Sequence, residues 1–285
     1  MPSLLSSPRN KAPWKLPSTL LPRSTGILGF ILLVQAYFFT GRFSIFWEDV
    51  FYAAAGVGFP LTIAMHRSLC VLMGHLTWMA IGSLILRTIP RPQPFFGGGY
   101  EYIPETEDID NEDNIDSRVK RPRKYKWFTS TWKTNWLWWT IGGYFVSSWM
   151  FNIADFINQV VLPPEILEAT AEGVVAQLIN PEHNDLTASI VGCIAPCISA
   201  PWWEEVLYRG FMLPAMCLHM PFWVSVLLSG LVFSAHHISA TGAIPLAVLG
   251  WTWAAIYAKS GNLLVTILIH AMWNSRVFLG SWLGL

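Results

Sequence analysis

Long apolar runs, separated by short polar stretches, occupy most of the chain. Runs of this kind are typical of helices that cross or enter a membrane, which need roughly 20 residues for a full span. The predicted membrane segments are residues 26–40, 50–65, 68–86, 127–156, 186–200, 222–236, 243–258 and 263–279. The pattern therefore predicts an all-α fold, a polytopic transmembrane helical bundle of about seven to eight spans.

Two segments differ from the simple spanning pattern. Residues 50–65 are apolar but contain Gly56, Gly58 and Pro60, which predict a broken or re-entrant segment. Residues 163–178 have apolar positions at helical spacing but are too polar to span. We expect this second segment to form an amphipathic helix at the membrane surface.

The chain divides into three parts by composition. Residues 1–88 form a basic flank followed by anchor helices, residues 89–126 form a polar linker that is first acidic and then basic, and residues 127–285 form the core. The first 24 residues carry basic and no acidic side chains, which fits either a basic flank or a processed targeting segment. Plastid and endoplasmic reticulum membranes are the candidate locations.

Composition supports the membrane assignment. The chain is 53% hydrophobic and only 13% charged, whereas a soluble domain has about 25% charged residues. Its net charge is zero, which gives no indication of nucleic-acid binding. We expect an integral multi-pass protein whose first partner is the lipid bilayer.

A charged motif lies between two of the apolar runs. Glu205 and Arg209 are four residues apart, so on a helix they share a face and can form an ion pair. Glu204 points away from that face by roughly 140°. Ionised groups at bilayer depth usually face a protein interior and have a function. We therefore interpret Glu205 as structural and Glu204 as free to act.

Two later segments carry polar side chains that Glu204 could use. His237 follows the run 222–236, and His270 and Asn274 lie four residues apart on one face of the last run. We expect tertiary packing to bring these groups together around Glu204. The remaining membrane histidines are interpreted as interhelical hydrogen-bonding groups: His75, His219 and His236.

Taken in order, three motifs resemble the signature of the CPBP family, which comprises CAAX prenyl endopeptidases and bacteriocin-processing proteins. These motifs are Glu204-Glu205-x-x-x-Arg209, Phe233-x-x-x-His237 and His270-x-x-x-Asn274. The resemblance covers about residues 135–285. Each motif lies within or at the edge of an apolar helix, as the resemblance requires.

The resemblance implies a glutamate-dependent intramembrane endopeptidase. In it, Glu204 is the general base, His237 helps it to hold the attacking water, and His270 and Asn274 stabilise the oxyanion. Supporting roles fall to the other motif residues: Glu205, Arg209 and Phe233. The substrate class is a protein or peptide, and a prenylated CAAX tail is one candidate.

The need for a metal stays open at this point. One carboxylate and two imidazoles, Glu204, His237 and His270, could instead bind a divalent metal such as zinc and leave a position for water. The chain has no HExxH helix that would decide the question. The cofactor is therefore either none or a divalent metal.

Two other functions fit parts of the sequence. A non-catalytic membrane assembly or stabilising factor on the same scaffold is the main alternative, although intact polar residues in all three motifs argue against a decayed site. A transporter would also place charges in the membrane, but the chain has no evident inverted repeat.

Overall fold

The computed structural model describes residues 45–58, 61–88, 99–101, 123–125, 132, 135–168, 174–217, 220–239 and 241–284. The predicted span 26–40, residues 1–24 and most of the linker 89–126 lie outside this part of the chain.

The described residues are almost entirely helical. A helix that ends at residue 56 precedes the labelled elements. The helices that follow it are α2 (Ile63–Thr88), α3 (Trp136–Val161), α4 (Pro164–Glu168), α5 (Val174–Ile179), η5 (Glu182–Asn184), α6 (Leu186–Ile194), η6 (Ala195–Ser199), α7 (Ala200–Glu205), η7 (Val206–Met212), α8 (Leu213–Met216), α9 (Phe222–His236), α10 (Ala243–Ser260) and α11 (Leu263–Leu283). Two short antiparallel strands, β1 (Gly99–Glu101) and β2 (Arg123–Tyr125), pair Glu101 with Arg123. These strands are not predicted from the sequence, because three residues are too few to display an alternating pattern.

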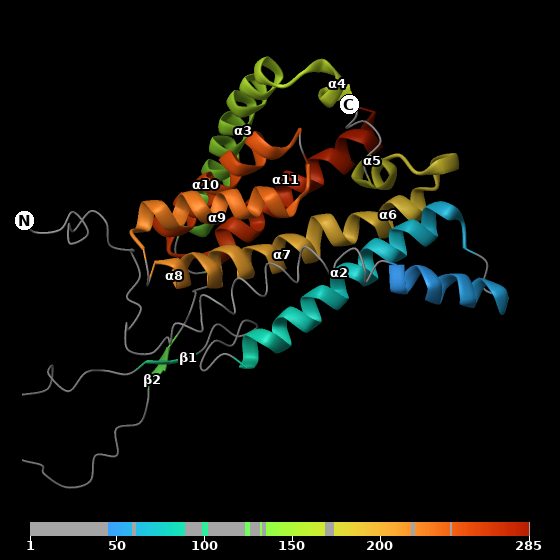
Figure 1. Ribbon diagram of the computed structural model, residues 1–285, viewed down its shortest axis with the longest axis horizontal. Helices are drawn as coiled ribbons and strands as arrows, with labels where there is room; N and C mark the ends of the chain where they lie inside the picture. The colour runs from blue at the N-terminus through green and yellow to red at the C-terminus, as the bar shows by residue number, and fades with distance from the viewer. Residues whose placement is uncertain are drawn as a thin grey trace, which may run out of the picture.

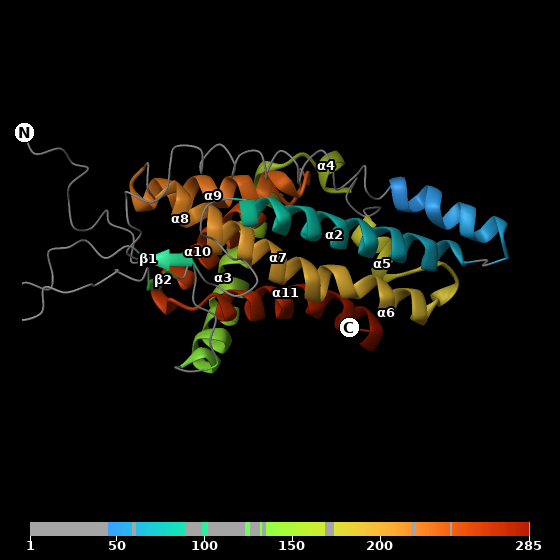
Figure 2. The ribbon, with the colours of Figure 1, turned by 90° about the horizontal axis from the view of Figure 1, so that it is seen from below.

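One continuous helical run forms the axis of the fold. Elements α6 to α8 follow each other without a break from Leu186 to Met216, a stretch of 31 residues. Helix α2 packs along α6, and α11 packs along η6 and α7, so both flank this axis (Figures 1 and 2). On the other side, α10 packs against both α9 and α3. The central run therefore contacts elements from both ends of the chain.

The sequence predicts that Pro201 begins the helix that carries Glu204, because proline is favoured in the first turn of a helix, and this prediction is wrong. Pro196, Pro201 and Pro214 all lie inside the continuous run. Two π-helical segments, η6 and η7, interrupt its α-helical hydrogen bonding. A π-helical turn is wider than an α-helical turn and shifts the hydrogen-bond register by one residue, so a proline can be accommodated without ending the helix. Such segments are also frequent at functional sites.

Glycines bring α9 and α10 into backbone contact. A Cβ atom added to Gly250 would lie 2.8 Å from the Cα atom of Gly230. This separation is closer than side chains allow, so the crossing needs glycine at both helices. The Gly250 carbonyl also accepts a hydrogen bond from Arg209 of the central run.

The N-terminal ends of α2 and α6 are joined by polar contacts. Thr62 donates a hydrogen bond of 2.8 Å to Asp185, and Arg67 pairs with Glu182 at 2.9 Å. Asp185 also accepts from the backbone N–H of Ala188 and so caps α6. The Ala188 N–H, followed by the Thr62 hydroxyl, holds the pKa of the Asp185 carboxyl below its usual range. The charged form of Asp185 therefore stabilises this junction.

Other predicted segments have mixed outcomes. The break in 50–65 is confirmed, since the first described helix ends at residue 56, Gly58 has a φ of +99°, and α2 starts only at Ile63. The predicted amphipathic helix 163–178 contains α4 near its start and α5 near its end, and the residues between them lie outside the described part.

Three described helices are long and apolar enough to cross a membrane: Ile63–Leu86, Leu186–Met216 and Leu263–Leu283. Phe222–His236 is a shorter apolar helix. These helices confirm the helical membrane class, and the count of seven to eight spans stays a prediction.

Candidate functional site

Two adjacent carboxylates, Glu204 and Glu205, occupy the end of α7 in the middle of the central run. Both are buried, with exposed fractions of 6% for Glu204 and 0% for Glu205. Their burial agrees with the prediction that charged groups here face the protein interior. Their surroundings, however, are very different.

Glu205 lies at the centre of a hydrogen-bonded network. Its Oε1 accepts from Arg209 Nη1 at 2.7 Å and lies 3.2 Å from His270 Nδ1. The second guanidinium nitrogen, Nη2, donates to the Gly250 carbonyl at 3.2 Å. The predicted Glu205–Arg209 pair is thus confirmed, and it ties the central run to α10 and α11.

Aromatic rings surround the Arg209 guanidinium. Its Cζ atom lies 4.6 Å from the ring centre of Phe233 and 5.3 Å from that of Trp253. Such cation–π contacts favour a buried guanidinium that has lost most of its water. Phe233 also lies 4.8 Å from the His237 ring and 6.0 Å from the His270 ring, so it packs between the motif residues.

Glu204 faces His237. The distance from Glu204 Oε2 to His237 Nε2 is 4.0 Å, and this carboxylate oxygen has no hydrogen-bond partner among the described residues. His237 Nδ1 lies 2.8 Å from the Phe233 carbonyl. Because a carbonyl only accepts, Nδ1 carries a proton, and the Nε2 of a neutral ring then presents a lone pair to Glu204. The His237 side chain is 29% exposed, so it lies at the outer side of the pair.

Asn274 contacts the central run at a different point. Its Nδ2 donates to the Pro196 carbonyl at 2.7 Å. In this π-helical turn the Ala200 N–H donates to the Ala195 carbonyl, five residues earlier. At the same spacing the Pro196 carbonyl would accept from the N–H of residue 201, but this residue is a proline and has no N–H. Asn274 supplies the missing donor. The two α11 residues therefore contact the central run, His270 at Glu205 and Asn274 at Pro196.

Tyr208 is a candidate that the sequence analysis missed. Tyr208 follows Glu204 by four residues, which is the same spacing as between Glu205 and Arg209. Because Glu205 and Arg209 share a helical face and are bonded, we expect Glu204 and Tyr208 to share a face as well. The Tyr208 side chain is buried, and its hydroxyl has no partner among the described residues. A buried hydroxyl without a partner is costly unless a ligand or water completes it. Its spacing of four from Glu204 was the available signal.

Further polar atoms near this site also lack partners. They are Trp203 Nε1, His236 Nδ1 and His75 Nε2, again among the described residues. His75 does bond Ser199 through Nδ1 at 3.0 Å. The Ser199 bond confirms His75 as an interhelical hydrogen-bonding residue. His236 Nδ1 has no partner in the described part of the chain, and His219 lies outside that part.

The three residues proposed as metal ligands do not form a metal site. Within the described ranges, no group of three or more His, Cys, Asp or Glu side chains could hold a metal ion. His270 directs its Nδ1 to Glu205 rather than joining Glu204 and His237. This geometry does not support the metalloprotease-like interpretation.

Comparison with known proteins identifies the part of the chain that contains this site. Residues 186–276 match the family described as type II CAAX prenyl endopeptidase Rce1-like. No curated protein and no solved structure matches the chain. The matched range contains all three motifs, and the family is one of membrane proteases, which supports an enzyme embedded in the bilayer. The match over residues 186–276 therefore agrees with the family resemblance that the three motifs indicated.

Proposed function

We propose that the protein is an intramembrane endopeptidase that hydrolyses a peptide bond with a water activated by Glu204. The observation that carries this proposal is the pair of facing atoms, Glu204 Oε2 and His237 Nε2, separated by 4.0 Å. Neither atom can donate to the other when the carboxylate is ionised and the ring is neutral. Each can accept a proton from the same water.

The spacing suits such a water. Two hydrogen bonds of about 2.8 Å that meet at a water oxygen with a near-tetrahedral angle separate their acceptors by about 4.5 Å. The observed 4.0 Å is close to this value and needs only a small adjustment. A water held in this way has its oxygen lone pairs directed away from both acceptors, where a substrate carbonyl carbon can approach.

The chemistry follows from these positions. The water oxygen attacks the carbonyl carbon while one of its protons passes to Glu204, which gives a tetrahedral intermediate. Collapse of the intermediate breaks the C–N bond, and Glu204 returns the proton to the leaving nitrogen. The products are a carboxylic acid and an amine. General acid–base catalysis of this type contributes roughly 10²- to 10⁴-fold.

Stabilisation of the oxyanion requires hydrogen-bond donors. His270 can donate from Nε2 when its ring is charged, and Asn274 has a second N–H beside the one bonded to Pro196. We add the Tyr208 hydroxyl, which is a donor in its neutral form and has no other partner among the described residues. A preorganised donor in a water-poor site contributes about 10²- to 10³-fold.

The proposed substrate is a peptide near the membrane, and the family name makes a prenylated CAAX tail the first candidate. Purified full-length protein in lipid should release a C-terminal peptide from a farnesylated CAAX substrate. Glu204→Gln should abolish release, whereas Glu165→Gln, which changes an exposed carboxylate on α4, should not. An unprenylated peptide and a chelator added to parallel reactions would test the substrate class and the need for a metal.

The main alternative gives a different result in the same experiment. A non-catalytic assembly factor would release no peptide in any variant and would bind its partner regardless of Glu204. Cleavage by the wild type that is unchanged in Glu204→Gln would contradict the proposed role of this carboxylate.

A further inference from the structure

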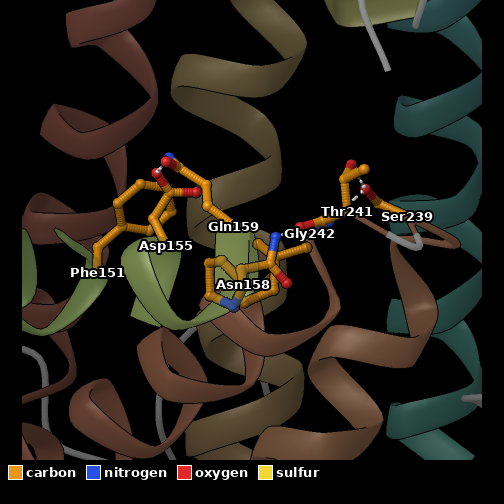
Figure 3. A pocket seen from close by; sticks show the side chains of 9 residues that line it. Phe151, Asp155, Asn158, Gln159, Ser239, Thr241 and Gly242 are labelled. Carbon is orange, nitrogen blue, oxygen red and sulfur yellow. Dashed lines mark hydrogen bonds between the residues drawn. The ribbon is translucent and has the colours of Figure 1, made fainter. Parts of the chain in front are cut away.

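A cavity of about 750 Å³ opens between the last turns of α3 and the start of α10. It is lined by residues of α3 on one side and by residues 239, 241 and 242 and the start of α10 on the other (Figure 3). Its volume lies in the range of sites that bind small ligands or large side chains. Phe151, Pro245 and Leu246 provide an apolar wall.

The buried side-chain amide of Asn158, one of the lining residues, has an oxygen without a hydrogen-bond partner among the described residues. Asn158 is 2% exposed, and its Nδ2 donates to the Thr241 carbonyl at 2.6 Å. Its Oδ1 is buried and has no hydrogen-bond partner among the described residues. Because the Nδ2 bond fixes the orientation of the amide, Oδ1 is held as an acceptor. A ligand with an N–H donor would satisfy it.

The charge of the lining selects the kind of donor. Asp155 is its one ionisable residue, and none of the lining residues is Lys, Arg or His. One carboxylate oxygen, Oδ2, accepts from Gln159 Nε2 at 2.8 Å, and this bond uses one amide donor of Gln159. The lining therefore offers a negative charge and surplus acceptors beside an apolar wall. This combination suits an ammonium or guanidinium group on an aliphatic stem.

The cavity lies next to the proposed catalytic pair along the chain. Its lining residue Ser239 is two positions after His237, so their Cα atoms are at most about 7 Å apart. Between them, Ile238 has a φ of +50°, which is rare for a β-branched residue. Strained residues of this kind concentrate at functional sites. The Asn158 bond to the Thr241 carbonyl fixes a second lining residue close to His237 in the sequence.

From these observations we propose that the cavity binds a lysine or arginine side chain of the peptide substrate. An extended peptide advances about 3.3 Å per residue, so this side chain would lie about two to four residues from the cleaved bond. Asp155 and Asn158 would bind the charged end, and the apolar wall would contact its stem. The proposal rests on the proposed function and adds a specificity site to it.

The test compares matched peptides. A series of otherwise identical peptides would carry Lys or Gln at each of the four positions on either side of the cleaved bond. Full-length protein in lipid should prefer Lys at one of these positions by about tenfold in kcat/KM, as a charge-assisted hydrogen bond allows. Asp155→Asn should reduce this ratio to nearly one, whereas the exposed-carboxylate control Glu165→Gln should retain it. A ratio that is unchanged in Asp155→Asn would overturn the proposal.

A binding measurement separates this inference from the proposed function. The Lys and Gln peptides, labelled with a fluorophore, would be titrated into the Glu204→Gln protein in phosphatidylcholine nanodiscs. A preference for Lys that Asp155→Asn and Asn158→Leu both remove would support the cavity even if no peptide were cleaved. Equal binding of both peptides would contradict it. So would displacement of the Lys peptide by phosphatidylethanolamine at membrane concentrations, since the cavity would then be a site for a lipid amine.

Discussion

The two neighbouring glutamates of the central run have opposite surroundings. Glu205 contacts Arg209 and His270 through one oxygen, and this guanidinium reaches the Gly250 carbonyl. Glu204 has no ion pair of this kind within the described ranges, and its Oε2 lies 4.0 Å from His237 Nε2. The first carboxylate is bound into the packing of three helices through its Oε1, whereas Oε2 of the second faces His237 and has no hydrogen-bond partner among the described residues. The comparison teaches that adjacent residues of one type can be divided between stability and chemistry by the groups that face them.

Removing the Glu204 carboxylate should have the largest effect on activity. Glu204→Gln keeps the shape of the side chain but removes the proton acceptor, so peptide release should fall by about 10³- to 10⁴-fold. The unfolding temperature should stay close to that of the wild type, because Glu204 Oε2 makes no hydrogen bond among the described residues. Turnover and thermal unfolding in the same lipid preparation would check both parts. A strongly destabilised Glu204→Gln would remove the distinction between the two glutamates.

Removing the Glu205 carboxylate should act mainly on stability. Glu205→Gln leaves the buried Arg209 without its charge partner, which costs on the order of 3–5 kcal/mol. Replacing both residues, Glu205→Gln with Arg209→Met, should be less harmful than either of these single changes, since no unpaired charge remains. Chemical or thermal unfolding of the four proteins in lipid measures this difference. Additive losses in the double variant would contradict a coupled pair.

Tyr208→Phe tests whether the Tyr208 hydroxyl donates to the oxyanion, and it does so without changing the packing of the ring. The ring lies 5.2 Å from Phe233 in an edge-on contact, and phenylalanine retains that contact. Loss of the hydroxyl should lower kcat by about 10²-fold, with little change in KM, if it donates only to the oxyanion. Tyr144→Phe, a change on α3, serves as the matched control. A wild-type kcat in Tyr208→Phe would exclude this hydroxyl from the reaction.

Much of this site could be predicted from local spacing. The Glu205–Arg209 pair depends only on an i, i+4 relation on one helix, and the sequence displays that relation directly. The contact of Asn274 with Pro196 could not be predicted, because it depends on a π-helical register and on α11 lying beside that turn. Pro201 was misinterpreted for the same reason, since proline normally marks a helix start or a break. The open hydroxyl of Tyr208 is likewise a property of tertiary packing rather than of spacing.

The smallest predicted effect concerns Asp185, which lies at the end of the central run farthest from Glu204 and His237. Since the folded state lowers the pKa of Asp185, the capping contribution is present above the ordinary Asp value of about 3.9 and is lost as the pH falls below it. Asp185→Asn should lower the unfolding temperature slightly at neutral pH, and this difference should shrink as the pH falls below the ordinary Asp value towards the lowered pKa of Asp185. Thermal unfolding between pH 3 and 7 would measure it. A difference that does not depend on pH would show that the charge is not involved.

The central claim is that Glu204 and His237 hold one water and act as a unit. A double-mutant cycle with Glu204→Gln, His237→Ala and the combined variant, assayed for peptide release in lipid, tests it most directly. If both residues serve the same water, each single change should lower kcat by about the same factor, and the combined change should lower it little further. If the two factors instead multiply in the combined variant, the residues act separately, and the shared water is contradicted.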